Sequence, residues 1–174
     1  MNQLLPTDLA HFIETHNINA RLIPCADETP TVPDAAAALG VTTDQIIKTL
    51  LFAVQRPMPS DKTGIVPADY VDHVVIISNG ESRVDKHLLS THFEVGKKRV
   101  KLASTETVLT LVGFPPGGVP PFGHRTKLPV LLDESVLTQR DRPIFGGGGD
   151  DQTMLELTVD ELIRVVEPTV LAVS

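Results

Sequence analysis

The chain has 174 residues, of which 41% are hydrophobic and 21% charged, and its formal net charge is −7. This length and composition suit a globular protein with one hydrophobic core. The negative charge argues against a protein that holds nucleic acid along a broad basic surface, because such proteins neutralise phosphates with lysine and arginine. We therefore expect no general DNA binding.

Cysteine usage and hydropathy exclude further classes. The single cysteine, Cys25, cannot form an internal disulfide or a cysteine-based zinc site. No signal peptide is evident at the N-terminus, and the longest apolar runs are too short to span a membrane. We expect a cytoplasmic protein with no membrane partner, no metal site and no cofactor.

The first half of the chain is expected to alternate short helices with extended segments. The patterns predict helices over residues 6–15 and 31–40, and strands over residues 21–25, 46–54 and 72–78. Thr31 is the expected N-cap of the second helix and Gly40 its stop, and Thr42 with Gln45 predicts a capping box for one further turn. Residues 55–69 contain three prolines and are expected to form a hairpin connection or a surface loop.

The second half shows the same mixture. The patterns predict helices over residues 81–89, 105–112 and 159–166, strands over residues 99–104, 128–135 and 153–158, and a glycine-rich turn over residues 144–151. Ser104 is the expected cap of the middle helix, and Thr158 with Glu161 forms another capping-box pattern. Because strands and helices do not alternate strictly, we expect a single α+β domain over residues 1–174, with a mixed, largely antiparallel sheet or open barrel flanked by helices.

Common catalytic motifs are missing. The sequence contains no P-loop, no GxGxxG, no GxSxG and no HExxH motif, and its six histidines show no metal-ligand spacing. The run Gly146–Gly149 is followed by no lysine, so it indicates a tight turn unless it faces a pocket.

Lys48 is the first of two features that remain. It lies between apolar residues in the strand predicted over residues 46–54. Such a lysine can extend its ammonium to the surface, pair with a carboxylate or face a pocket, and the first is the commonest. In a pocket it would present a cation to a carbonyl or phosphate oxygen.

The second feature is the segment VGFPPGGVPPFGH, residues 112–124. Its prolines stiffen the backbone and donate no hydrogen bonds, whereas its glycines allow positive φ and close approach. The amides of five residues can converge on an anion or a developing oxyanion: Gly117, Gly118, Val119, Phe122 and Gly123. Composition alone favours neither a site nor a plain connection. His124, which ends the segment, is either an ordinary hydrogen-bonding residue or part of the same cavity.

The basic cluster KKRVK, residues 97–101, interrupts an otherwise acidic chain. A solvated turn before a strand is the favoured interpretation, and a phosphate-binding patch is the alternative.

The order of TVPDAAAALGV, QIIKTLLF, VGFPPGGVPPFGH, LPVLLDES and a glycine turn resembles the YbaK/prolyl-tRNA-synthetase-associated domain family. The resemblance runs over residues 31–166. It implies an aminoacyl-tRNA deacylase that hydrolyses the ester of a mischarged tRNA, in trans, with a ribose hydroxyl of the substrate helping to activate water. The resemblance implies that the partner is the acceptor end of aminoacyl-tRNA. It is also compatible with an aminoacyl-tRNA synthetase as a second partner.

The resemblance also implies roles for single residues. Lys48 matches the family lysine that holds the terminal adenosine and ester, and Gly117 and Gly118 match the backbone that holds the aminoacyl end. The expected substrate-binding residues form a larger set: Pro121, Phe122, Gly123, His124, Gly147 and Gly148. Asp133 matches a recurring acidic position.

Asp150 and Asp151 stand where the best-known branch of the family has a basic residue. The edited amino acid is therefore left open among alanine, cysteine, proline and other small residues. The acidic pair also motivates an alternative function, a non-catalytic module on the same fold that binds a small ligand or a protein. General nucleic-acid binding is disfavoured by the charge and the scarcity of aromatic residues.

Overall fold

The computed structural model describes residues 2–57 and 70–174. The strands are β1 (Arg21–Pro24), β2 (Ile47–Arg56), β3 (Tyr70–Asn79), β4 (Val100–Leu102), β5 (Val130–Asp133), β6 (Ile144–Gly147), β7 (Thr153–Leu157) and β8 (Thr169–Leu171). The helices are α1 (Pro6–Thr15), α2 (Val32–Leu39), α3 (Lys86–His92), α4 (Thr105–Leu111) and α5 (Val159–Val166), with short 3₁₀ turns η1 (Thr43–Gln45), η2 (Lys97–Arg99) and η3 (Glu134–Gln139). No helix in these ranges is long and apolar enough to cross a membrane.

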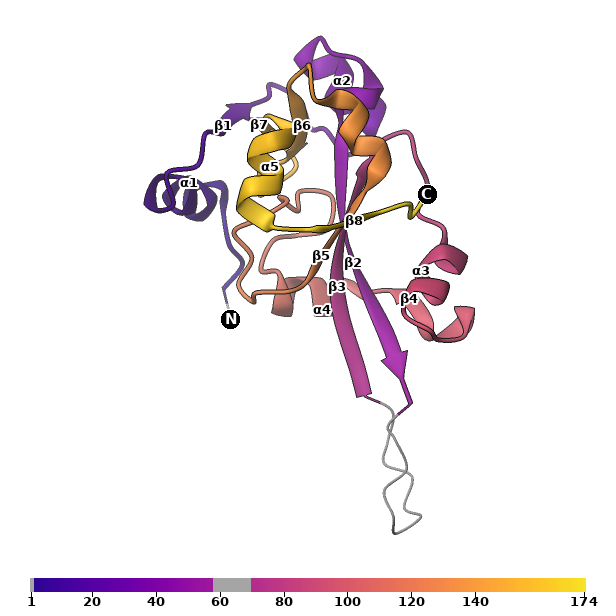
Figure 1. Cartoon of the computed structure of the whole chain (residues 1–174). Coiled ribbons are helices and arrows are strands. Elements are labelled where there is room, and N and C mark those ends of the chain that lie inside the picture. The colour runs from indigo at the N-terminus through magenta and orange to yellow at the C-terminus, as the bar shows by residue number, and fades with distance from the viewer. Residues whose placement is uncertain (1, 58–69) are drawn as a thin grey trace.

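The strands form two open sheets. The larger has the order β4-β2-β3-β5-β8, and the smaller has the order β1-β7-β6. β2 and β3 form a long antiparallel pair that runs from Ile47 opposite Asn79 to Arg56 opposite Tyr70 (Figure 1). β5 joins β3 in parallel, and β8 joins β5 in parallel. The predicted mixed α+β fold is confirmed, as open sheets flanked by helices.

The larger sheet is buried on both faces. Strand residues alternate between faces, so Ile47 and Leu51 of β2 pack with Leu9 of α1 and Leu162 of α5 in one core cluster. Phe52 and its alternate neighbours lie on the other face, where a second cluster includes Leu89 of α3. Burial on both faces explains why β2 and β3 appear in the sequence as nearly continuous apolar runs.

Among the described residues, one isolated backbone bridge links the smaller sheet to the larger one, in addition to the core that the two sheets share. Ile46 and Phe145 form an isolated parallel bridge that joins the start of β2 to β6. Ala35 and Ala36 of α2 pack against this junction, together with Met154 of β7. The small side chains of the predicted helix therefore allow it to approach the sheet closely.

The predicted helix caps are confirmed. The hydroxyls of Thr31, Ser104 and Thr158 each accept a hydrogen bond from the backbone amide three residues later. Gly40 ends α2 in the left-handed conformation, as a helix C-cap favours. The capping box of Thr42 and Gln45 is present. Glu161 instead accepts from the Asn19 amide and pairs with Arg164, so only half of the second expected box forms.

The structure differs from the predicted elements in three main places. The helix expected over residues 81–89 begins at Lys86, because the Asn79 side chain accepts from the Glu81 amide and Asp85 supplies the N-cap. The first residues of the expected glycine turn belong to β6. β8 was not expected; it is a three-residue edge strand. Of the connection expected over residues 55–69, residues 58–69 lie outside the described residues.

Candidate active site

A pocket of about 320 Å³ lies beside the first half of β2. Its walls include residues 29–32, residues 46–50, Gly117, Val119 and Gly147, and we call it the Lys48 pocket. β4 pairs only with Phe52–Val54 of β2, and the bridge to β6 is confined to Ile46. The pocket therefore occupies a part of the β2 edge that neither strand covers.

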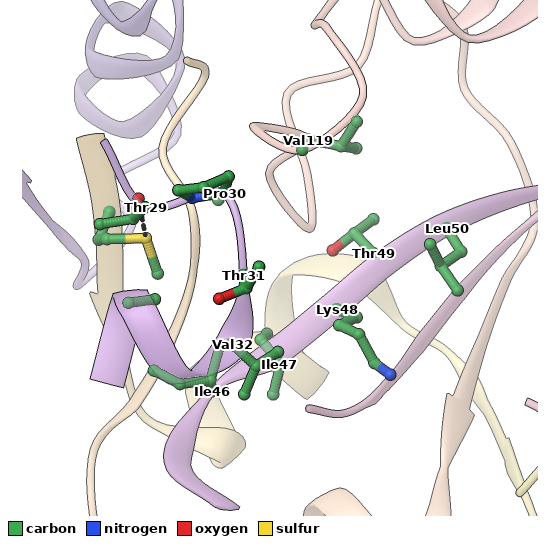
Figure 2. A pocket seen from close by; sticks show the side chains of 14 residues that line it. Thr29, Pro30, Thr31, Val32, Ile46, Ile47, Lys48, Thr49, Leu50 and Val119 are labelled. Carbon is green, nitrogen blue, oxygen red and sulfur yellow. Dashed lines mark hydrogen bonds between the residues drawn. The ribbon is translucent and has the colours of Figure 1, made fainter. Parts of the chain in front are cut away.

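Lys48 contributes a cation at the rim of this pocket. Its ammonium donates a hydrogen bond of 2.6 Å to the Ser82 carbonyl. Figure 2 shows the side chain turning away from Val119 and from residues 29–32. Burial, and secondly the positive charge of Arg83, lower the pKa of Lys48. The ammonium is thus held by one carbonyl beside a second cation, an arrangement that an anionic ligand would stabilise.

The side chain of Thr49 points in the direction opposite to that of Lys48. Its side chain is 9% exposed, and its hydroxyl has no hydrogen-bond partner among the described residues. In Figure 2 this hydroxyl faces the space between residues 29–32 and Val119. An unpaired buried hydroxyl costs about 1–3 kcal/mol, and a ligand that hydrogen-bonds it would remove that cost. The sequence analysis missed this residue, although a polar side chain next to Lys48 in an apolar strand was a signal.

The backbone of Thr49 adds to the polar wall. The Ala103 amide donates to the Leu51 carbonyl on the β4 side of β2. Because successive strand residues direct their backbone groups to opposite edges, the amide and carbonyl of Thr49 face that same edge. At Thr49 the edge borders the pocket rather than another strand.

The first half of the Pro/Gly segment forms a tight turn over the pocket. The Gly118 amide donates to the Pro115 carbonyl at 3.1 Å. Pro116 and Gly117 occupy the centre of the turn, and Gly117 has φ +94°, a combination typical of type II turns. The amides of Gly117 and Val119 donate to no described part of the chain. These two amides, rather than that of Gly118, are the available donors at the pocket.

Two glycines let this turn lie directly on the smaller sheet. A Cβ atom on Gly147 would lie 2.5 Å from the Val119 carbonyl oxygen, and one on Gly118 would lie 2.5 Å from the Asp150 carbonyl oxygen. The Gly149 amide donates to the Gly118 carbonyl at 2.9 Å. The glycine run is therefore required for close packing of two backbones.

Gly148, Asp150 and Asp151 lie in the connection between β6 and β7, and their hydrogen bonds hold it in place. The Gly148 amide donates to the Thr153 carbonyl. The Asp150 carboxylate accepts from the Gln152 amide at 3.0 Å, and the Asp151 carbonyl accepts from the Thr29 amide at 2.8 Å. Asp151 thereby fixes one wall of the Lys48 pocket through its backbone.

The second half of the Pro/Gly segment borders a different cavity. Residues 121–128 surround a volume of about 420 Å³ together with Phe12 of α1, His16 just after it, and Val165 and Val166 of α5. We call it the second pocket. Its two most central polar side chains are paired, since His124 Nε2 hydrogen-bonds the Pro120 carbonyl at 2.7 Å and the Arg125 guanidinium donates to three carbonyls. Burial lowers the pKa of His124, and the bond to Pro120 opposes this.

Comparison with known proteins assigns the chain to a family. Residues 26–165 match the sequence model described as the aminoacyl-tRNA editing domain. The chain belongs to this family. It is 31% identical over 96 residues to the multifunctional Ser/Thr-tRNA deacylase ProXp-y of Escherichia coli K12, a match that covers 55% of this chain and 56% of that protein. The aligned region thus spans about half the length of that relative.

Two further proteins extend the likeness along the chain. An uncharacterized Bacillus subtilis protein, YwhH, is 29% identical over 132 residues, which cover 76% of this chain and 72% of that protein. A crystal structure assigned as a trans-editing enzyme for prolyl-tRNA synthetase superposes with a TM-score of 0.79 at 26% identity. That superposition covers 97% of this chain and 96% of the other.

Within this editing-domain fold, the expected site residues fall into three groups. Lys48, Gly117 and Gly147 share the Lys48 pocket. Gly118 and Gly148 pack behind it and line neither pocket. The remaining four, Pro121, Phe122, Gly123 and His124, line the second pocket. That any of these residues binds substrate stays a prediction.

The remaining acidic and metal-binding candidates lie elsewhere. Asp133 is 1% exposed and accepts from the Val173 amide and from the Ser135 and Ser174 hydroxyls, so it anchors residues 173–174 to β5. Across residues 2–57 and 70–174, no group of three histidine, cysteine, aspartate or glutamate residues is placed to hold a metal ion.

Proposed function

We propose that this editing domain hydrolyses the ester bond of tRNA mischarged with a small amino acid, acting in trans on the acceptor end. Support comes from the family and from one observation: among the described residues, a buried hydroxyl and two amides without partners lie at an uncovered edge of β2, and Lys48 directs its ammonium to the rim beside them. These are groups that bind an anionic ribose-phosphate end and a polar acyl group.

The reaction needs little from the chain itself. None of the described residues around the pocket is a histidine, cysteine or carboxylate. We therefore infer that the base is a hydroxyl of the substrate's terminal ribose. Water attacks the ester carbonyl carbon, the bond from that carbon to the ribose oxygen breaks, and this oxygen leaves with a proton. The products are the free amino acid and uncharged tRNA.

The roles follow from position. The Lys48 ammonium binds the terminal phosphate or ribose at the rim, where it also offsets developing negative charge. The free amides of Gly117 and Val119 hold the acyl carbonyl oxygen. Gly118, Gly147 and Gly148 fix the turn that carries these amides, and residues 121–124 support it from the second pocket. Such positioning without a protein base is sufficient when the substrate supplies the proton acceptor.

The amino acid is proposed to be small and polar. Thr49 offers a hydroxyl that an apolar acyl group would leave unpaired, and a site that hydrogen-bonds a substrate hydroxyl strongly disfavours the analogue that lacks it. The relative from Escherichia coli is named for seryl and threonyl substrates. We therefore expect serine or threonine ahead of alanine, cysteine and proline.

A panel of aminoacylated tRNAs tests the proposal. Purified protein is incubated with tRNA carrying serine, threonine, alanine, cysteine or proline, and release of labelled amino acid is followed. We expect the fastest release from seryl- or threonyl-tRNA. Failure to release any amino acid, or full activity of Lys48→Ala, would contradict the proposal.

The lack of a base around the pocket also fits a second function, a binding module without catalysis. Thermal-shift measurements with non-hydrolysable aminoacyl-adenosine analogues separate the two. Stabilisation by the analogues together with hydrolysis of the tRNA supports the enzyme, whereas stabilisation by an unrelated small molecule alone supports the module.

A further inference from the structure

One stretch of the chain has a charge opposite to the rest. Residues 83–101 contain six lysines and arginines and only two carboxylates, in a protein whose net charge is −7. The sequence places part of these cations before α3 and part after it. Their spacing along the chain does not show whether they act together.

The structure brings three of them to one surface. Arg83, Lys86 and Lys97 surround a shallow cavity of about 410 Å³ with Val84 and Asp85, and we call these three cations the basic surface. All three side chains are exposed, and none forms an ion pair with the described residues. The Asp85 carboxylate accepts from the His87 amide at the start of α3, so it is engaged in capping.

This surface adjoins the rim of the Lys48 pocket. The Lys48 ammonium is bound to the Ser82 carbonyl, next to Arg83 in the chain. The charge of Arg83 is close enough to lower the pKa of Lys48. Cations therefore extend from the pocket, through Lys48 and Arg83, to Lys86 and Lys97, with the capping carboxylate of Asp85 among them.

Unpaired cations on one surface repel one another, and a polyanion removes that repulsion. A nucleic-acid backbone carries one negative charge per nucleotide, so a short row of cations matches a short run of phosphates. A single phosphate would engage only part of the row. The row also begins at Lys48, where the proposed function places the acceptor end of the substrate.

We propose that the basic surface binds the sugar-phosphate backbone of the tRNA just before its aminoacylated end. This inference rests on the proposed function and adds a second contact area, outside the pocket, to it. It explains how an acidic protein binds a polyanion: the attraction is confined to one surface, and the negative remainder disfavours other binding modes. The KKRVK cluster, whose alternative interpretation is a phosphate-binding patch, is thus joined on this surface by a cation of α3.

The experiment compares two substrates in one double variant. Lys86→Glu/Lys97→Glu reverses two cations without touching Lys48 or Arg83. The substrates are full-length aminoacyl-tRNA and the same amino acid esterified to a short CCA oligonucleotide. We expect KM for the tRNA to rise about tenfold or more, while kcat/KM for the oligonucleotide changes less than twofold. Lys127→Glu reverses one exposed lysine at the second pocket, and this single-reversal control should change neither.

Binding of uncharged tRNA is measured for the same proteins as a function of salt. Losing two phosphate contacts should reduce the slope of log K against log salt by about 1.5. This measurement tests the basic surface even if wild-type protein hydrolyses nothing in the panel, so the two proposals fail separately. An unchanged slope, an equal loss on both substrates, or an equal effect of Lys127→Glu would each overturn the inference.

Discussion

The two pockets share one loop but differ in how their polar groups are satisfied. Around the Lys48 pocket, the Thr49 hydroxyl and the amides of Gly117 and Val119 have no partner within residues 2–57 and 70–174. Around the second pocket, His124 and Arg125 are bonded to carbonyls, and Phe122 is buried and stacks on Phe12 with ring centroids 6.0 Å apart. Folding alone accounts for the second set, whereas the first set is available to a ligand. We therefore expect ligand contacts from the first half of the loop and structural support from the second.

The strongest way to break this comparison is to remove the cation of the first pocket. Lys48→Ala should lower kcat/KM for aminoacyl-tRNA by about 100-fold or more, the range for loss of one electrostatic contact to a transition state, with little change in Tm. Lys127→Ala removes an exposed cation at the second pocket and should leave both unchanged. Equal losses in the two variants would erase the distinction between the pockets.

The next largest effect is expected where the Pro/Gly loop packs against the smaller sheet. Gly147→Ala places a Cβ 2.5 Å from the Val119 carbonyl and must shift the turn that carries the free amides. We expect kcat/KM to fall between about 10- and 100-fold, since small displacements of positioning groups are costly. Gly96→Ala is the control, because a Cβ there meets no atom within 4 Å. Wild-type activity in Gly147→Ala would show that the turn need not lie against β6.

Thr49→Val should separate activity from stability. The substitution removes the unpaired hydroxyl and keeps the shape, so we expect the free energy of unfolding to rise by about 1 kcal/mol. Hydrolysis of seryl- or threonyl-tRNA should fall by about 5- to 10-fold, the value of one hydrogen bond. Thr49→Ser retains the hydroxyl and should retain the preference among amino acids. Lower stability of Thr49→Val would indicate that the hydroxyl is paired within the protein.

The smallest effect is expected at His124. Because its pKa is lowered by burial, the unfolded chain binds this proton more readily, and stability should fall as pH drops below about 6.5. Chemical denaturation between pH 5 and 8 should show a shallower dependence in His124→Gln. Activity per folded molecule at pH 7.5 should be unchanged. If His124 instead shapes the amino-acid pocket, as the resemblance implies, the variant will alter the order of preference in the tRNA panel.

Local sequence patterns were enough to predict the helix caps and the positions of most strands. Thr31, Gly40, Ser104 and Thr158 act at single helix ends, and their side chains or backbone conformations decide the outcome within a few residues. Tertiary contacts were not visible in the same way. Gly146 and Gly147 indicate a turn by composition, yet they are strand residues because they pair with Leu155 and Met154 of β7.

For the site, the sequence singled out Lys48 and the Pro/Gly loop but grouped too many residues together. A linear stretch such as residues 112–124 does not show that its halves border different cavities. Thr49 escaped notice for a related reason: its significance is the lack of a partner, and partners are defined only by the fold. The basic surface likewise needed α3 and η2 to be placed together.

The pairing of β1 with β7 has a consequence for how the protein is made. Arg21 lies opposite Glu156, so the smaller sheet joins segments separated by most of the chain. The walls at Gly147 and Met154 cannot be in place until the ribosome has released residue 157. Such long-range pairing also closes slowly. A nascent chain will therefore pass through most of its synthesis with β2 and β3 able to pair but with no formed pocket, so editing activity should appear abruptly, only after β7 has emerged.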